Sequence, residues 1–290
     1  GVWGQTMSDN NRTQAYTPEG ALSIENQVGT APCFIVKHKQ SRVICLPGVP
    51  IEMNYLMEYK VLPYLRRSLP NVKTIKTRVL HTVGLGESVV DSRIGDLEAL
   101  DNPTVGLTAH VGVVDIRITS SGDNETEANH LIAQVEDTVR KRLGASIFGS
   151  DGDSLESIVL RQIEGAGLSL STVESGTRGQ LAEKLAKADD GRGVFQVGAI
   201  SPKLTSSSNL ETSVVQMSKD CLMTHRTDIN LASVVVRRKN RILIGVALGR
   251  AETGATISEV RGYGGHIDHA GELSAHVALN LLLTKTPNKS

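Results

Sequence analysis

The chain has 290 residues, 39% of them apolar, and its 31 basic side chains balance 31 acidic ones. This length predicts about two or three domains, and the composition excludes wholesale disorder. With a formal net charge of zero, the chain has no overall field to attract nucleic acid or a membrane surface, and we expect neither as a partner.

The cysteines and apolar runs indicate a cytoplasmic protein. Cys33, Cys45 and Cys221 are odd in number, and their spacing fits neither a zinc ribbon nor a disulfide framework. Reduced thiols are therefore expected. No apolar run reaches the roughly 18 residues of a membrane span, and no signal-peptide pattern opens the chain. Gly1 in place of an initiator Met indicates a piece of a longer protein.

The first segment, residues 1–72, is predicted to be the carboxyl part of an α/β domain. Residues 33–36 and 43–46 are typical of buried strands, and a helix is expected over 52–67. The intervening Pro47-Gly48-Val49-Pro50 ends the second strand, because Pro cannot continue a ladder. Such a turn suits either a simple connection or a crevice in which backbone N–H groups bind a ligand.

The second segment, residues 73–150, is predicted to be a compact α+β module. A strand is expected over 77–83 and a half-buried strand over 114–119, where apolar and polar residues alternate. Residues 125–143 have the apolar stripe of an amphipathic helix, with Gly144 at its carboxyl cap. Residues 148–152 are predicted to be a linker, which a protease would cut first.

The third segment, residues 151–290, alternates strands with helices, which predicts an α/β domain. Helices are expected from residue 155 and over 270–283, and strands over 168–173, 229–236 and 242–248. The basic run Arg237-Arg238-Lys239-Asn240-Arg241 is assigned to a solvated hairpin rather than to a binding patch.

Residues 174–179, Glu-Ser-Gly-Thr-Arg-Gly, join a strand to a helix. Hydroxyls, glycines and one Arg at a helix start suit an anion cradle, and they equally suit a helix cap formed by Ser175 or Thr177. No Gly-Lys-Ser/Thr follows, which excludes a Walker loop. A group of polar side chains near the final helix is assigned to capping and solvation, so no metal site is predicted: His266, Asp268, His269 and His276.

Motifs in the first segment resemble the CinA family (competence/damage-inducible protein A): Asn11-Arg12-Thr13-Gln14-Ala15, Pro18-Glu19-Gly20-Ala21, Asn26, Gly29-Thr30-Ala31-Pro32 and Leu46-Pro47-Gly48-Val49-Pro50-Ile51-Glu52-Met53. In that family they lie in a molybdopterin-binding-type α/β domain with divalent-metal-dependent ADP-ribose pyrophosphatase activity. The resemblance implies a divalent cation for the full-length protein. It also implies that a nucleotide or nucleotide sugar contacts eight residues here: Asn11, Gln14, Gly29, Thr30, Pro47, Gly48, Pro50 and Glu52. The family's Gly-Gly-x-Gly-Pro-Thr-x-Asp-Asp loop is missing, so this chain alone is not expected to hydrolyse ADP-ribose.

The later segments resemble the rest of that family. Residues 73–150 are similar to its small KH-like module, although no GXXG clamp supports RNA binding. Residues 151–290 are similar to its carboxy-terminal α/β domain, a nicotinamide mononucleotide deamidase. Residues 174–179 match that domain's Glu-Ser-x-Thr-Gly-Gly motif, with Arg178 in place of a glycine. The resemblance implies that four of these residues contact substrate: Glu174, Ser175, Thr177 and Gly179.

The chain departs from the deamidase pattern at its catalytic positions. Where the family has Gly-Ser-Ser with the nucleophile, this chain has residues 189–193, Asp-Asp-Gly-Arg-Gly. Where the family has the activating Lys, this chain has residues 200–204, Ile-Ser-Pro-Lys-Leu. Ser201 and Lys203 remain as candidates for a shifted nucleophile and base, but a hydroxyl without its base is a weak nucleophile. We expect a domain that binds a nucleotide or forms a homodimer without catalysis; a deamidase with rearranged residues is the alternative.

Overall fold

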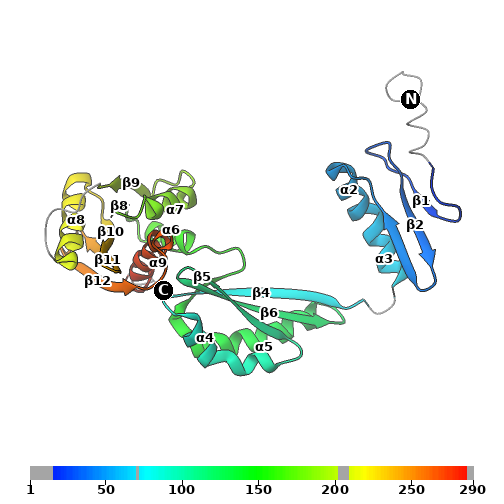
Figure 1. Cartoon of the computed structure of the whole chain (residues 1–290), viewed down its shortest axis with the longest axis horizontal. Coiled ribbons are helices and arrows are strands. Elements are labelled where there is room, and N and C mark those ends of the chain that lie inside the picture. The colour runs from blue at the N-terminus through cyan, green and yellow to red at the C-terminus, as the bar shows by residue number, and fades with distance from the viewer. Residues whose placement is uncertain (1–15, 70–71, 202–208, 286–290) are drawn as a thin grey trace, which may run out of the picture. The chain divides into compact units, whose positions relative to one another are not determined.

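The computed structural model describes residues 16–69, 72–201 and 209–285 (Figure 1). The chain divides into two compact units, Gly1–Lys73 and Thr74–Ser290, which are described separately below. Both units combine sheets with helices, which confirms the predicted α/β class. The finer division into residues 1–72, 73–150 and 151–290 stays a prediction.

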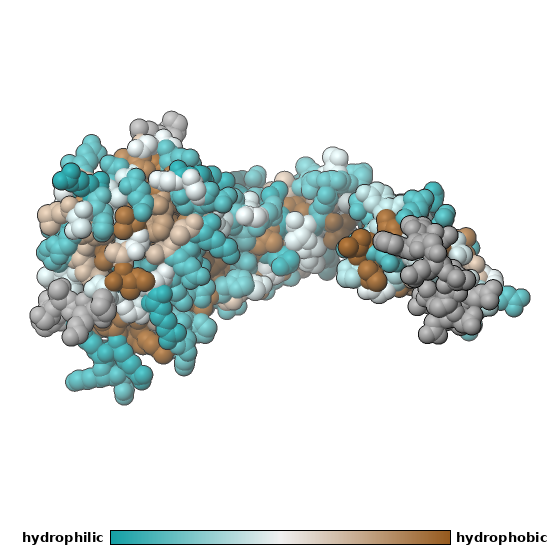
Figure 2. All heavy atoms as spheres, turned by 90° about the horizontal axis from the view of Figure 1, so that it is seen from above, coloured by the Kyte–Doolittle hydropathy of each residue, from teal (hydrophilic) through white to brown (hydrophobic). Residues whose placement is uncertain are grey.

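The first unit contains one antiparallel sheet and one helical segment. The sheet has the order β1 (Leu22–Ile24), β2 (Cys33–His38), β3 (Ser41–Cys45). The segment runs through α2 (Pro50–Leu56), the π-helical η1 (Met57–Val61) and α3 (Leu62–Ser68). Pro63 has no N–H to continue the α-helical ladder, and Leu62 donates to the Met57 carbonyl instead, which accounts for the π turn. Apolar side chains lie exposed at the surface of this unit (Figure 2). Ile51 is one of the exposed apolar residues, with an exposed fraction of 76%.

In the second unit, one sheet has the order β5 (Thr104–His110), β6 (Val113–Gly122), β4 (Thr74–Val83), β7 (Ile147–Ser150). It packs against α4 (Glu87–Ile94) and α5 (Glu125–Leu143), which lie together in Figure 1. Short 3₁₀ turns, η2 (Gly95–Ala99) and η3 (Gly144–Ser146), follow these helices. Asn124 caps α5 by accepting from the Glu127 N–H, and Gly144 ends it at a φ of 54°. The predicted amphipathic helix over 125–143 is confirmed.

The linker predicted over residues 148–152 is wrong, because this segment is bound to the sheet. It contains most of β7, which pairs with β4. The next residue, Asp151, donates its N–H to the Val79 carbonyl at 2.8 Å, and its carboxylate accepts from the Val79 N–H at 3.0 Å. The Asp151 carboxylate also forms an ion pair with Arg78. We therefore expect this segment to resist proteolysis.

His81 on β4 links the neighbouring strand β6 to the segment at residues 148–151. Its Nδ1 lies 2.7 Å from a carboxylate oxygen of Asp115 on β6, its Nε2 lies 3.0 Å from the Asp151 carbonyl, and its ring stacks on Phe148. His110 also contacts Asp115, at 3.2 Å. Burial alone lowers the pKa of His81, but the bonds to Asp115 and Asp151 outweigh burial and raise that pKa overall.

We expect the second unit to lose stability as the pH rises through the raised pKa of His81. The pKa of His81 is higher in the folded state than its value of about 6.5 in the unfolded chain. The protonated ring therefore stabilises the fold fully at pH values below the unfolded pKa, and this stabilisation is lost as the pH rises through the folded pKa. His81→Gln should lower the free energy of unfolding by about 1 kcal/mol at pH 6 and by less at pH 8.5. Urea unfolding at both pH values measures this, with the exposed His225→Gln as control. Equal losses at both values would contradict the assignment.

The other sheet of the second unit has the order β12 (Thr256–Tyr263), β11 (Arg241–Arg250), β10 (Ile229–Arg238), β8 (Leu170–Ser175), β9 (Phe195–Ile200). Strand β8 is parallel to β9 and β10, and the β10–β11–β12 pairs are antiparallel. One core joins the sheet to α6 (Leu155–Gly165), α7 (Gln180–Asp189) and α9 (Ile267–Lys285). A second core packs α8 (Leu210–His225) on the other face (Figure 1). None of the described helices is long and apolar enough to cross a membrane.

The basic run at residues 237–241 forms the turn between β10 and β11. Arg238 pairs with Arg241 across the hairpin, and Lys239 has a φ of 53°. The predicted hairpin is confirmed. Because Val234 of β10 is in register with Ser175 of β8, this hairpin extends beyond the carboxyl end of β8. Ligands of open α/β sheets bind at this edge.

Candidate functional site

Residues 174–179 connect β8 to α7 at the carboxyl edge of the parallel strands. Glu174 and Thr177 are buried, with exposed fractions of 0% and 1%, and Ser175 is 5% exposed. Only Gly176 and Arg178 are exposed in this turn. The side chains that the family motif assigns to substrate are therefore mostly enclosed by the protein.

The Glu174 carboxylate caps the start of α7. It accepts from the Thr177 hydroxyl at 2.6 Å, the Leu181 N–H at 3.1 Å and the Ala182 N–H at 2.8 Å. A negative charge at a helix amino terminus is favourable. A cap by Ser175 or Thr177 was one of the two readings that the sequence left open, but the N-cap residue of α7, Gly179, has no side-chain cap, and Glu174 takes that role. Contact of this turn with substrate stays a prediction.

Backbone geometry fixes the shape of the same turn. Gly176 has a φ of 72°, and a Cβ there would lie 2.1 Å from the Val235 carbonyl oxygen of β10. Arg178, which stands in place of the family's glycine, also has a positive φ, 62°. Its guanidinium lies 3.1 Å from Asp268 at the start of α9. Gly271 of α9 leaves no room for a side chain, because a Cβ would lie 2.7 Å from the Thr177 carbonyl oxygen.

Asp189 closes the loop that stands where the family places its nucleophile. One carboxylate oxygen accepts from the Val194 and Phe195 N–H groups at 3.0 Å, and the other accepts from the Gly193 N–H at 2.8 Å. Burial alone raises the pKa of Asp189, but these backbone bonds outweigh it and lower that pKa overall. Residues 189–195 contain no hydroxyl or thiol. This loop therefore offers no nucleophile of the expected kind.

The remaining candidates of residues 151–290 are only partly placed. Ser201 follows β9, and its N–H donates to the Glu174 carbonyl at 2.7 Å. Lys203 lies outside the described residues. His276 does not join His266 and His269, since its Nδ1 lies 2.6 Å from the Val111 carbonyl. Among the residues the structure describes, no group of three or more His, Cys, Asp or Glu side chains could hold a metal ion.

In the first unit, Asn26 joins the predicted site residue Glu52 to the neighbouring loop. Its amide nitrogen donates to a Glu52 carboxylate oxygen at 2.6 Å and to the Ala31 carbonyl at 3.0 Å. Glu52 lies against Gly29, where a Cβ would come within 2.0 Å of the carboxylate carbon. Of the other candidates, Pro47 is buried, whereas Thr30, Gly48 and Pro50 are exposed. Asn11 and Gln14 lie outside the described residues.

Comparisons with known proteins decide the family. Residues 77–149 match the family model "Damage-inducible protein CinA KH domain". A "Putative competence-damage inducible protein" of Caldanaerobacter subterraneus subsp. tengcongensis is 35% identical over 251 residues, which is 87% of this chain and 59% of that protein. Another so named, of Clostridium botulinum (strain Loch Maree / Type A3), is 40% identical over 208 residues, 71% of this chain and 50% of that protein. A "CinA-like protein" of Kosmotoga olearia is 36% identical over 233 residues, covering 80% and 56%.

The chain belongs to the CinA family. The resemblance read from its motifs is thereby confirmed, and the matched KH segment lies within the predicted second segment. This CinA-family chain spans between 50% and 59% of the length of these relatives.

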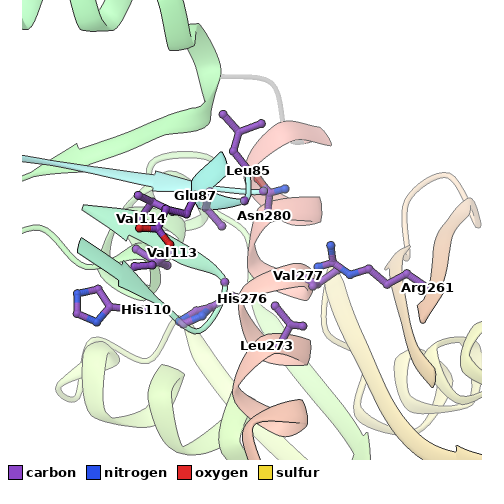
Figure 3. Close-up of a pocket in the computed structure, with 15 residues that line it drawn as sticks. Leu85, Glu87, His110, Val113, Val114, Arg261, Leu273, His276, Val277 and Asn280 are labelled. Atoms are coloured by element: carbon purple, nitrogen blue, oxygen red, sulfur yellow. The ribbon is translucent and has the colours of Figure 1, made fainter. Parts of the chain in front are cut away.

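The second unit also contains a cavity of about 260 Å³ that the sequence analysis missed. It lies between α9 and the β5–β6 sheet edge, with His276, Asn280 and Arg261 among its lining residues (Figure 3). Burial, followed by the charge of Lys184, lowers the pKa of His276. Gly84 and Gly112, both at positive φ, allow the backbone at these two turns to lie close to side chains of α9. These two glycines were the features of the sequence that could have indicated the cavity. The mixed donors and acceptors suit a small polar molecule.

Proposed function

We propose that this CinA-family chain belongs to a protein of nucleotide metabolism, and that residues 151–290 bind a nucleotide without hydrolysing an amide. The observation that carries this is the loop at residues 189–195, which is closed on the Asp189 carboxylate and has no nucleophile. Amide hydrolysis requires an activated nucleophile and an oxyanion site. The folded scaffold and its carboxyl edge remain, and that edge is where nucleotides bind in related architectures.

The deamidase question is tested by ammonia release from nicotinamide mononucleotide. We expect the 290-residue chain to release no more ammonia than an enzyme-free control, since losing nucleophile and base leaves only small residual catalysis. Calorimetric titration with the same compound tests binding separately. Ammonia release that Lys203→Ala abolishes would restore the alternative of a rearranged deamidase. Absence of any nucleotide binding would instead favour a dimerisation scaffold.

For the longer protein we propose metal-dependent hydrolysis of a nucleotide pyrophosphate such as ADP-ribose. The contacts among Asn26, Gly29 and Glu52 support a pocket wall supplied by the first unit. The described residues do not fit a divalent cation by themselves, since they hold no group of three suitable ligands. The free cysteines, which include buried Cys33 and Cys221, support a proposed cytoplasmic location.

We expect the 290-residue chain to release no AMP from ADP-ribose in the presence of Mg²⁺ or Mn²⁺. The physical reason is that Glu52 is a single carboxylate already bonded to Asn26, whereas a catalytic divalent cation takes several oxygen ligands. Phosphate-coupled detection of AMP measures this. Metal-dependent turnover that Glu52→Gln removes would contradict the expectation.

A further inference from the structure

A second cavity in residues 151–290, of about 250 Å³, lies where the β10–β11 hairpin meets the loop from β12 to α9. The hairpin contributes Arg237, Asn240 and Ile242, the end of β12 contributes Tyr263, and the loop contributes Gly264, Gly265 and His266. We call this the hairpin cavity. It adjoins the 174–179 turn, because Asp268 contacts both Arg178 and His266.

The hairpin cavity has an excess of positive charge. Arg237 begins a run in which four of five residues are basic and none is acidic. The Arg237 side chain has no ion-pair or hydrogen-bond partner among the described residues. Its neighbour Arg238 does have a partner. Asp268 is shared between Arg178 at 3.1 Å and His266 at 3.2 Å, so it leaves the Arg237 guanidinium uncompensated. An unpaired guanidinium at a cavity wall favours an anion that accepts two parallel bonds.

An aromatic side chain shapes the opposite wall. A Cβ at Gly265 would lie 2.2 Å from the Tyr263 hydroxyl oxygen, so the Tyr263 side chain lies over Gly265 and only glycine leaves room for it. At the preceding Gly264, a Cβ would meet nothing within 4 Å. The absence of a side chain at Gly265 therefore leaves the space that the ring occupies. An aromatic face beside a cation suits a ligand that joins an anionic group to a planar one.

We infer that the hairpin cavity binds the phosphate of a small phosphomonoester, with Arg237 as its ion-pair partner, His266 and Asn240 as further polar contacts, and Tyr263 against the organic part. This inference rests on the proposed nucleotide binding and names the position of the phosphate. The cavity is smaller than the roughly 300–1,000 Å³ of drug-sized ligand sites, which favours a monophosphate over a dinucleotide. At the neighbouring 174–179 turn, Glu174 already occupies the Leu181 and Ala182 N–H groups.

The test is calorimetric titration of the 290-residue chain with nicotinamide mononucleotide, AMP, inorganic phosphate and unphosphorylated adenosine. We expect both monophosphates and phosphate to bind and adenosine to bind at least tenfold more weakly than AMP. Arg237→Ala should weaken monophosphate binding by about 10- to 100-fold. Arg241→Ala is the matched control, since it removes the same charge from the same exposed hairpin without lining the cavity, and it should change the Kd less than threefold.

A second pair of variants tests the shape of the site. Gly265→Ala should displace Tyr263 and weaken monophosphates more than inorganic phosphate, whereas Gly262→Ala, at an exposed position of β12 that does not line the cavity, should leave both unchanged. Monophosphate binding that Arg237→Ala leaves intact would overturn the inference while the proposed nucleotide binding stands. Equal losses in Arg237→Ala and Arg241→Ala, or binding of a single-stranded RNA oligomer in place of the monophosphates, would also overturn it. No binding of any phosphate compound would overturn both proposals.

Discussion

Glu174→Ala should destabilise the second unit by about 3–5 kcal/mol, because several buried hydrogen-bond donors lose their acceptor. The Glu174 carboxylate is fully buried and accepts from a hydroxyl and two backbone N–H groups. Its removal leaves all these donors without partners in a place that water does not reach, and a buried polar group that loses its partner costs about 1–3 kcal/mol. The start of α7 would also lose a favourable negative charge.

Urea unfolding followed by circular dichroism measures this loss, with Glu183→Ala as control. Glu183 lies in the first turn of the same helix but is exposed, so its replacement should change the free energy of unfolding by less than about 0.5 kcal/mol. Glu174→Gln should be intermediate, because the amide keeps only one acceptor oxygen. A loss below about 1 kcal/mol for Glu174→Ala, accompanied by weaker nucleotide binding, would instead make Glu174 a substrate contact.

The parts of the fold that the sequence predicted have long local patterns. The helix over residues 125–143 has an apolar stripe, a capping Asn124 and a terminal Gly144, and these signals agree with one another. The basic hairpin was predictable because strands with continuous apolar runs flank it. Strand β7 was missed because its short pattern gives little periodicity, and its place in the sheet depends on pairing with residues of β4 that are distant in the chain.

The candidate site was less predictable because its contacts are not local. The motif at residues 174–179 was found, but the cap on α7 comes from a carboxylate that lies seven residues before the Leu181 N–H. Capping rules that search only the residues next to a helix start do not reach it. The hairpin cavity joins Arg237 to Tyr263 and His266, and only the order of strands in the sheet brings them together.

Gly176→Ala should destabilise the second unit by more than about 3 kcal/mol, for two additive reasons. The φ of 72° disfavours any residue with a Cβ, and that Cβ would lie 2.1 Å from the Val235 carbonyl oxygen. The backbone of β10 cannot easily move away, because Val235 pairs with Ile244 of β11 and the preceding Val234 pairs with Ser175 of β8.

Gly193→Ala separates the two reasons. Gly193 has a similar φ of 77°, but a Cβ there would meet nothing within 4 Å. Alanine at this position keeps the N–H that donates to the Asp189 carboxylate. The replacement should therefore lower the free energy of unfolding only by the left-handed backbone strain of about 1–2 kcal/mol. The difference between the two variants in urea unfolding then measures the steric conflict between the 174–179 turn and β10. Equal losses would show that β10 yields to the added methyl group, and that the close approach of this turn to the strand does not fix the shape of the edge where a nucleotide is proposed to bind.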